Sequence, residues 1–435
     1  MAIDTATLTS LADTLKTVYG DGITNQFADE VTTYNQFSKS SVKPSGEGYV
    51  FGVRYERAQN AGARLEGEIL PPSVVGKYDK GRILPKSIYS QLQITGNMID
   101  TATNSMDSFV IGLAGQVDDT YQSLLNDLNR QCWGDGFGLI GTLSAASDAL
   151  STSVAWTATL NNTRGVQYVK DGEIVDFFDS TAVDQSSTSC RVSYSNAETK
   201  VVTFEGNDGS YKAVHPITAF RGYTITTAAV PDGAFMVKQG AREASHATSN
   251  ISRELTGLLG IYDNGTLIST FEDILVSTHP KWSANILSNS GVDRELSIDL
   301  MLQAINKTRQ VSGKKVDILR MGLGQRRKYA NLLIGDRRFM DSKLKGGYEE
   351  LSFAAGDGTV TIIIDRDAQP GMIFFEPKGV IEKYELTPIG WVNEGNLLQT
   401  TGYDTYTMAL KIRTNLGVQQ RNCLTVLKDL CEPTA

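Results

Sequence analysis

The sequence has few of the side chains on which catalytic and metal sites usually depend. Its 435 residues include only three histidines and four cysteines. The histidines, His215, His246 and His279, have neither metal-ligand nor catalytic-motif spacing, and the cysteines form no CxxC pair. The motifs GxSxG and HExxH are absent as well. We therefore expect no catalytic residues, no metal and no cofactor, and the sequence does not indicate an enzyme.

Charge and hydropathy argue against two further classes of protein. The formal net charge is -8 at pH 7, so the chain lacks the basic surface with which proteins neutralise nucleic-acid phosphates. We expect no sequence-specific binding to nucleic acid. No run of about 18 apolar residues occurs, so we expect no association with membranes through a spanning helix. The N-terminus lacks the basic start and apolar block of a secretory signal, which indicates a protein that is cytosolic when made.

Two strand patterns near the N-terminus flank a long charged connection. Residues 49–58 and 82–95 carry β-branched and aromatic side chains in partial alternation, which predicts two strands. The connection of about 23 residues is rich in glycine, proline and charge, and it is long for a hairpin. Such a connection is usually either a functional loop or a loop that a partner orders. Between 51 and 90, seven basic residues outnumber four acidic ones: Arg54, Arg57, Arg64, Lys77, Lys80, Arg82 and Lys86 against Glu56, Glu66, Glu68 and Asp79.

Residues 103–132 form the clearest helical pattern. Apolar residues recur at steps of three or four on one face: Val110, Leu113, Val117, Tyr121, Leu124 and Leu128. At about 1.5 Å per residue, such a helix would be roughly 45 Å long, and we expect it to act as a strut. The other face of this helix is acidic, with Asp107, Asp118, Asp119 and Asp127.

A glycine-rich stretch, QCWGDGFGLIGTL, directly follows this helix. It suggests either a phosphate-binding loop or a turn that ends the helix. Phosphate loops place glycines before a helix, whose free N–H groups then point at the anion. Here the glycines come after the helix, so we expect a turn made by Gly134, Asp135, Gly136 and Gly138. We expect Gly134 to adopt the left-handed conformation that ends many helices.

In the rest of the chain, the predicted type of secondary structure changes twice. From about 150 to 255, short strand patterns alternate with Asn, Gly and Asp turns, which predicts a β-rich module. Residues 295–310 and 324–334 have helical patterns. Strand patterns lie between and after them, in KVDILRMG, TVTIIID and GMIFFEP, and the C-terminus is rich in strands.

Two groups of charged residues in the second half allow both a chemical and a structural interpretation. Asp365 and Asp367 follow a strand pattern, as magnesium ligands can, but acids that precede Pro370 are more often turn formers. The second group is basic and could bind an anion, although a solvated or interface face is the favoured interpretation. Its members are Arg320, Arg326, Arg327 and Lys328.

The order of these elements resembles that of the major capsid proteins of tailed phages, which have the HK97-like fold. In the first half, the resemblance rests on RLEGEILPP, on ITGNMID before the long helix, and on the GDG-G turn after it. The second half follows the same order, with DLMLQAINKTRQ, VDILRMGLGQRRKYANLL, GTVTIIIDRDAQPGMIFF and TYTMALKIRTNLGVQQRNCLTVLKDL. The resemblance covers roughly residues 1–150 and 275–435.

The resemblance implies an α+β fold with five regions. They are an N-terminal arm (1–35), an extended loop (36–95), a peripheral domain (96–149, 275–317 and 396–435) with the spine helix 103–132, a β-rich insertion domain (150–274) and an axial domain (318–395). The minimal HK97-like fold lacks the insertion, so the resemblance assigns it no role.

A function is implied as well. The protein would be a major capsid protein that self-assembles into pentamers and hexamers of an icosahedral phage head enclosing double-stranded DNA. It would be made in the host bacterial cytoplasm and reside in the virion. Its partners would be further copies of the chain, a scaffolding protein, a portal and, in some phages, a decoration or cement protein. The extended loop would contact the next subunit through Arg54, Arg57, Arg64, Glu66, Glu68, Lys77 and Lys80.

Two other functions remain open at this point. The first is an encapsulin-like nanocompartment shell, which has the same fold and encloses enzyme cargo. The second is a carbohydrate-binding or carbohydrate-active protein built on the β-rich module, where Glu173 and Asp176 lie close in sequence. Glycoside hydrolases depend on a pair of carboxylates, and the sequence shows no signature of such a pair.

Overall fold

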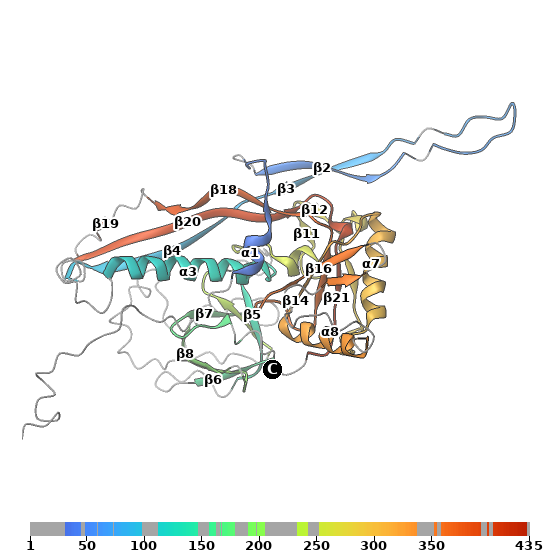
Figure 1. Cartoon of the computed structure of the whole chain (residues 1–435). Coiled ribbons are helices and arrows are strands. Elements are labelled where there is room, and N and C mark those ends of the chain that lie inside the picture. Colours follow the sequence, from blue (N-terminus) through green and yellow to red (C-terminus); the bar gives the residue numbers. More distant parts are fainter. Residues whose placement is uncertain are drawn as a thin grey trace, which may run out of the picture. The chain divides into compact units, whose positions relative to one another are not determined.

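A computed structural model of the chain gives the fold (Figure 1). It describes residues 31–44, 48–58, 60–72, 74–97, 112–146, 156–161, 166, 168–178, 190–196, 198–204, 233–241, 252–336, 352–354, 358–392, 398–399 and 403–432. Most of the expected N-terminal arm and residues 103–111 of the expected spine helix, with Asp107 and Val110, lie outside these ranges. None of the helices described here is long and apolar enough to cross a bilayer.

The chain divides into two compact parts. The larger part comprises Glu30–Tyr89, Leu125–Gly390 and Lys411–Ala435, and the smaller part contains Ser90–Leu124 and Trp391–Leu410. In the smaller part, β19 (Leu398–Gln399) pairs antiparallel with the start of β20 (Thr405–Val418). The backbone N–H of Gly96 donates to the carbonyl of Asp404 (3.0 Å).

A mixed sheet organises the main core of the larger part. Its strands, in spatial order, are β13 (Asn285–Leu287), β21 (Thr425–Leu427), β17 (Ile373–Glu376), β14 (Ile318–Met321), β16 (Thr359–Ile364) and β15 (Ser352–Ala354). Two helices contribute side chains to its core: α7 (Ile298–Ser312) and α8 (Leu323–Asp336). These elements confirm the helices and strands predicted in this region.

The ends of α7 show why the helix has these bounds. Ser297 precedes it, and its hydroxyl accepts a hydrogen bond from the backbone N–H of Leu300 (3.2 Å), as an N-cap does. Gly313 follows it with a φ of 72°, and its N–H donates to the carbonyl of Arg309. Met301 and Ile305 lie on the face between these caps that packs on the sheet.

The N-terminal strands form a hairpin and an edge strand. The first predicted strand is β2 (Tyr49–Glu56), which pairs antiparallel with β3 (Lys77–Ile83). The second predicted strand, 82–95, is wrong as a single element, because it contains the end of β3 and all of β4 (Lys86–Thr95). Pro85 separates them, since proline has no N–H to donate to a strand ladder.

The shorter elements complete the larger part. After helix α1 (Thr32–Gln36), strand β1 (Ser38–Lys39) pairs in parallel with β18 (Ile381–Trp391). The remaining short elements are α6 (Leu258–Ile261), β11 (Thr270–Phe271), β12 (Ile274–Leu275) and the 3-10 helices Pro280–Trp282 and Arg421–Cys423.

Six antiparallel strands close into a small barrel within the larger part. Going round the barrel, they are β10 (Phe235–Lys238), β5 (Leu139–Ala146), β6 (Trp156–Leu160), β9 (Val201–Phe204), β8 (Cys190–Asn196) and β7 (Ile174–Phe178). The interior is apolar, and the rings of Phe177 and Phe204 meet edge to face with centroids 5.6 Å apart. The expected boundary at 149/150 falls between β5 and β6, so the barrel begins earlier in the chain than the expected insertion.

The long helix is α3 (Gly112–Cys132). Leu124 and Leu128 are buried, and Val117 and Tyr121 are half-buried. Leu113 also lies in α3. Asp118 and Asp119 are exposed, as expected for an acidic face. For Asp127 this expectation is wrong, because its carboxylate is only 15% exposed and carries two ion pairs described below.

The turn after α3 differs from the expectation in one respect. The N–H of Gly134 donates to the carbonyl of Gln131 (3.0 Å), which tightens the end of the helix. Gly134 does not adopt the left-handed conformation; Gly136 (φ 92°) and Gly138 (φ 72°) do. The spacing of Gly136, Gly138 and Gly141 also fits GxGxxG, but the chain continues into β5, so there is no helix N-terminus here to bind a phosphate.

Alanine substitutions should separate the roles of these glycines. We expect Gly138→Ala to be the most destabilising, because a Cβ there would overlap the Cβ of Ala241 at a left-handed φ. Gly136→Ala should cost about 1–2 kcal/mol through backbone strain alone, since its nearest neighbours are 3.4 Å away. Gly134→Ala is the control and should be close to neutral. Chemical denaturation of the purified variants measures this order, and an equal loss at Gly134 would contradict it.

Candidate assembly interface

The β2–β3 hairpin carries the most exposed apolar surface near its tip. Figure 1 shows the connection between its strands extending away from the rest of the larger part. Every described residue from 57 to 70 is exposed. Large apolar side chains are among them: Leu65 is 76%, Ile69 89% and Leu70 79% exposed. Single exposed apolar residues are ordinary, but a group of them on a projecting loop is typical of a site that a partner covers.

The tip of the connection has its own local structure. The N–H of Leu65 donates to Glu68 Oε2 (3.0 Å), and the N–H of Glu68 donates to the carbonyl of Leu65 (3.2 Å). Gly67 supplies the left-handed conformation of this turn, with a φ of 85°. Arg64 Nε donates to the carbonyl of Ile69 (2.9 Å). Glu66 lies within this turn, exposed and without a side-chain partner among the described residues.

The other charged residues expected at the contact lie along the hairpin and are all exposed. Lys77 forms an ion pair with Glu56 across the two strands (2.9 Å). Within the described part of the chain, the side chains of Arg54, Arg57 and Lys80 form no ion pair. The structure thus brings the predicted contact residues together on one element.

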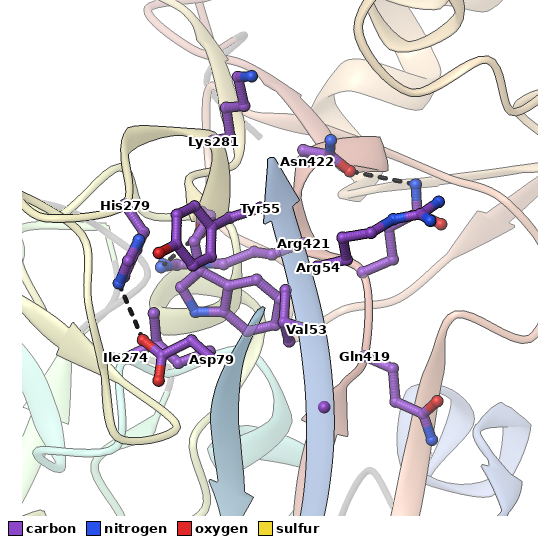
Figure 2. Close-up of a pocket in the computed structure, with 13 residues that line it drawn as sticks. Val53, Arg54, Tyr55, Asp79, Ile274, His279, Lys281, Gln419, Arg421 and Asn422 are labelled. Carbon is purple, nitrogen blue, oxygen red and sulfur yellow. Dashed lines mark hydrogen bonds and ion pairs between the residues drawn. The ribbon is translucent and has the colours of Figure 1, made fainter. Parts of the chain in front are cut away.

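A pocket of about 290 Å³ lies at the base of the hairpin, away from the tip (Figure 2). On one side, the ring of Tyr55 packs on that of His279 (centroids 4.3 Å apart). His279 Nε2 lies 2.8 Å from Asp79 Oδ2. Tyr55 belongs to β2 and Asp79 to β3, so both strands of the hairpin hold His279. Arg54 and Asn422 lie on the opposite side of the pocket in Figure 2.

The pocket is electropositive. The buried guanidinium of Arg421 donates to the carbonyls of Ile261 (2.8 Å) and Gly260 (2.9 Å) and lies 4.2 Å from the centre of the Phe271 ring. Burial lowers the pKa of Arg421 to about 10, so it is still charged at neutral pH. Arg54 and Lys281 at the rim are exposed and form no ion pair among the described residues. Such a pocket can receive a carboxylate.

The turn beside this pocket contains a buried carboxyl group. Glu272 and Asp273 both have a positive φ, and the N–H of Arg82 on β3 donates to the carbonyl of Glu272 (2.8 Å). Glu272 Oε1 accepts from the N–H of Val418 (2.9 Å). Burial raises the pKa of Glu272 well above its usual range, although Val418 and Arg421 lower it. The turn therefore holds the base of the hairpin through this backbone hydrogen bond. The buried carboxyl group of Glu272 in the same turn favours its protonated form.

Asp365 and Asp367 hold the end of the N-terminal segment in place. Asp365 Oδ2 accepts from the backbone N–H of Thr33 (3.1 Å) and from its hydroxyl. The side-chain amide of Asn129 donates to Asp367 Oδ2 (2.7 Å). The N–H of Asp367 donates to Asp365 Oδ1 (2.8 Å), so the predicted turn is confirmed. Across the described residues, no group of acids, cysteines and histidines could hold a metal ion.

The sequence favoured a solvated or interface face for Arg320, and this prediction is wrong. Arg320 lies on β14 and is 1% exposed. Its guanidinium donates to Glu376 Oε1 through Nε (3.1 Å) and Nη2 (2.7 Å), and to Gln36 Oε1 through Nη1 (3.1 Å). It also lies 4.4 Å from the centre of the Phe37 ring. Lys328 is half-buried and pairs with the exposed carboxylate of Glu295 (2.6 Å).

A second buried ion network was not expected from the sequence. Arg130 near the end of α3 pairs with Asp127 (3.0 Å) and Glu254 (2.5 Å), and Lys238 on β10 pairs with Asp127 (2.7 Å). Burial alone would raise the pKa of Asp127, but Lys238 and Arg130 hold it well below its usual range. The network ties the end of α3 to the barrel. Only the Asp127–Arg130 spacing of three residues was visible as a signal in the sequence.

Both acids of the carbohydrate hypothesis make contacts within the protein. Glu173 lies 3.3 Å from the ammonium group of Lys238 and accepts from the N–H of Lys170 (3.2 Å). Asp176 is buried and accepts from the N–H of Gly240 (3.0 Å). These contacts give both carboxylates a structural role within the protein.

Comparison with known proteins identifies the fold. No protein-family model and no curated protein matches the chain. Among solved structures, the capsid asymmetric unit of cyanophage A-1(L) matches with a TM-score of 0.59 and 11% sequence identity, over 98% of this chain and 99% of that one. The chain has the α+β fold of a phage capsid protein. Identity this low shows a common fold and does not by itself assign a function.

Two further structures match at lower scores. The capsid of a native GTA particle has a TM-score of 0.48 at 9% identity, over 99% of this chain and 100% of that one. The holo-SrpI encapsulin complex from Synechococcus elongatus has a TM-score of 0.43 at 8% identity, over 100% of this chain and 99% of that one.

The Arg320–Glu376 pair predicts a non-additive double mutant. We expect Arg320→Met alone to cost about 3–5 kcal/mol of unfolding free energy, because it leaves the buried Glu376 without its partner. Arg320→Met combined with Glu376→Leu should recover most of this loss, since no buried charge is then left unpaired. Denaturant unfolding of the two single variants and the double variant measures the coupling. Additive losses would show that the two side chains act independently.

Glu272 predicts a pH dependence of stability. A carboxyl group with a raised pKa contributes stability below about pH 4.5, its unfolded pKa, and this contribution is lost as the pH rises through the folded pKa. Glu272→Gln cannot ionise, so it should reduce the fall in melting temperature between pH 5 and pH 8. The exposed Glu198→Gln on the barrel is the control and should melt as the unchanged protein does. Identical pH profiles for Glu272→Gln and the unchanged protein would overturn this assignment.

Proposed function

We propose that this protein is the major capsid protein of a tailed phage, which self-assembles into pentamers and hexamers of an icosahedral head around double-stranded DNA. The observation that carries the proposal is the match to a phage capsid structure over 98% of this chain and 99% of that one. The projecting hairpin supports the proposal as well, because its exposed apolar tip is typical of a surface that a partner covers.

The hairpin supplies the mechanism of assembly in this proposal. The apolar tip and the basic strands of one copy would contact a different surface on the next copy. Such a contact is head-to-tail. A head-to-tail contact forms closed rings when the rotation between copies closes. Five- and six-membered rings can then share one contact, provided that the hairpin bends slightly. Many such contacts acting together hold a shell although each is small.

The domain assignments of the HK97-like fold are part of the same proposal. Residues 1–35 would form the N-terminal arm, 36–95 the extended loop, and 318–395 the axial domain. The peripheral domain would comprise 96–149, 275–317 and 396–435, and the barrel would form the insertion domain assigned to 150–274. A scaffolding protein, a portal and, in some phages, a cement protein would be the partners of the shell. Exposed Asp118 and Asp119 and the net charge of -8 fit a wall that does not adhere to packaged DNA.

Electron microscopy and light scattering of the expressed chain test the proposal. We expect closed shells or rings of five and six subunits. A matched variant replaces residues 57–76, the connection between β2 and β3, with the two-residue turn Asn-Gly. It keeps the strand pairing, because Glu56 and Lys77 face each other at the end of the ladder, and Asn-Gly forms tight hairpins.

This variant should melt at nearly the same temperature as the unchanged chain but should not assemble. A chain that stays monomeric even with a candidate scaffolding protein would contradict the proposed function. Shells that enclose a protein cargo and exclude DNA would favour the encapsulin-like alternative.

A further inference from the structure

We propose that the pocket at the base of the hairpin is the receptor for the hairpin tip of a neighbouring copy, with Glu66 as the group it binds. This inference deepens the proposed function and rests on it. It names the residues of a donor turn and of an acceptor pocket, which the general idea of a basic loop contacting an acidic neighbour does not.

The donor is the turn at residues 65–68. Glu68 is occupied by the N–H of Leu65, whereas the Glu66 carboxylate is exposed and has no partner among the described residues. Leu65 and Ile69 flank it and are 76% and 89% exposed. The turn thus presents one free negative charge between apolar side chains. Its own hydrogen bonds hold it in shape, so little conformational entropy is lost when it binds.

The acceptor is the pocket whose rim carries Arg54 and Lys281, both without ion pairs in the described structure. The buried charge of Arg421 lies below them, bonded only to backbone carbonyls and an aromatic face. The one acid of the pocket, Asp79, is engaged with His279. Val53 and Tyr55 supply half-buried apolar surface next to the rim. The pocket and the tip are therefore complementary in charge and in apolar character.

Geometry excludes this contact within one copy. The tip lies at the far end of the hairpin from its base (Figure 1), because the pocket residues of the hairpin lie on β2 and β3 and the turn lies in the connection beyond the ends of these strands. Glu66 therefore cannot reach the pocket of its own chain, but a neighbour's Glu66 can. Because the donor turn and the acceptor pocket are different surfaces, each copy can bind one neighbour through its turn and another through its pocket. Contacts of this kind can close into rings.

Charge exchange tests the pairing. We expect Glu66→Arg to reduce the yield of shells at least about tenfold at low salt, and Arg54→Glu with Lys281→Glu to do the same. The variant that combines all three changes should assemble again, because the reversed charges match. Lys307→Glu on α7 is the matched control, since Lys307 is exposed but neither lines the pocket nor belongs to the predicted contact residues. It should assemble normally.

Sedimentation and electron microscopy measure assembly, and thermal melting shows whether each variant is folded. Failure of the unchanged chain to assemble overturns the proposed function and this inference together. If the unchanged chain assembles, three results overturn this inference alone. They are normal assembly of Glu66→Arg, no recovery in the triple variant although it melts normally, and a defect in Lys307→Glu as large as that of the pocket variant.

Discussion

The buried guanidinium of Arg320 is the interaction on which the larger part most depends. It joins Glu376 on the neighbouring strand to Gln36, which is 284 residues away in the sequence. A buried charge is tolerated only when its hydrogen bonds are satisfied, so the position of Gln36 is tied to that of the sheet. Asp365 acts in the same way on Thr33. Two buried polar contacts therefore decide where the chain runs before it enters the hairpin, and they set the point from which the hairpin projects.

Charges are distributed very differently in the interior and on the hairpin. Inside, Asp127, Arg130, Glu254 and Lys238 satisfy one another around the end of α3 and the barrel. On the hairpin, cations and apolar side chains face solvent in the isolated chain. The interior charges thus contribute stability within one copy, whereas the cations and apolar side chains of the hairpin do not contribute to its core.

The sequence predicted those elements whose signals are local. The periodicity of α3, the helical pattern of α7, the strands of the sheet and the charged hairpin connection could all be read from short windows. The order of these elements was enough to indicate the fold. The errors concern residues whose partners are distant in sequence. Arg320 was grouped with the basic start of α8, but its strand position turns it inward towards Glu376.

The same limit explains the candidate site. Asp127 was assigned to an outward acidic face, because Lys238, which pairs with it, lies more than a hundred residues further along the chain. The same is true of Glu254, which pairs with Arg130 in the same network. The residues of the hairpin were visible in the sequence as a charged connection. The pocket was not, because its lining comes from β2, β3, the 274–282 segment and residues 419–422, and only folding brings these together.

The way in which the barrel joins the rest of the larger part has a consequence for how such chains change over time. Its first strand in the sequence, β5, pairs with its last, β10, so the chain leaves and returns at neighbouring points. The N–H of Lys238 even donates to the carbonyl of Gly138 (3.1 Å), which closes the module at its base. A module with adjacent ends and no free sheet edge can be gained, lost or exchanged in a single recombination event without rerouting the surrounding chain.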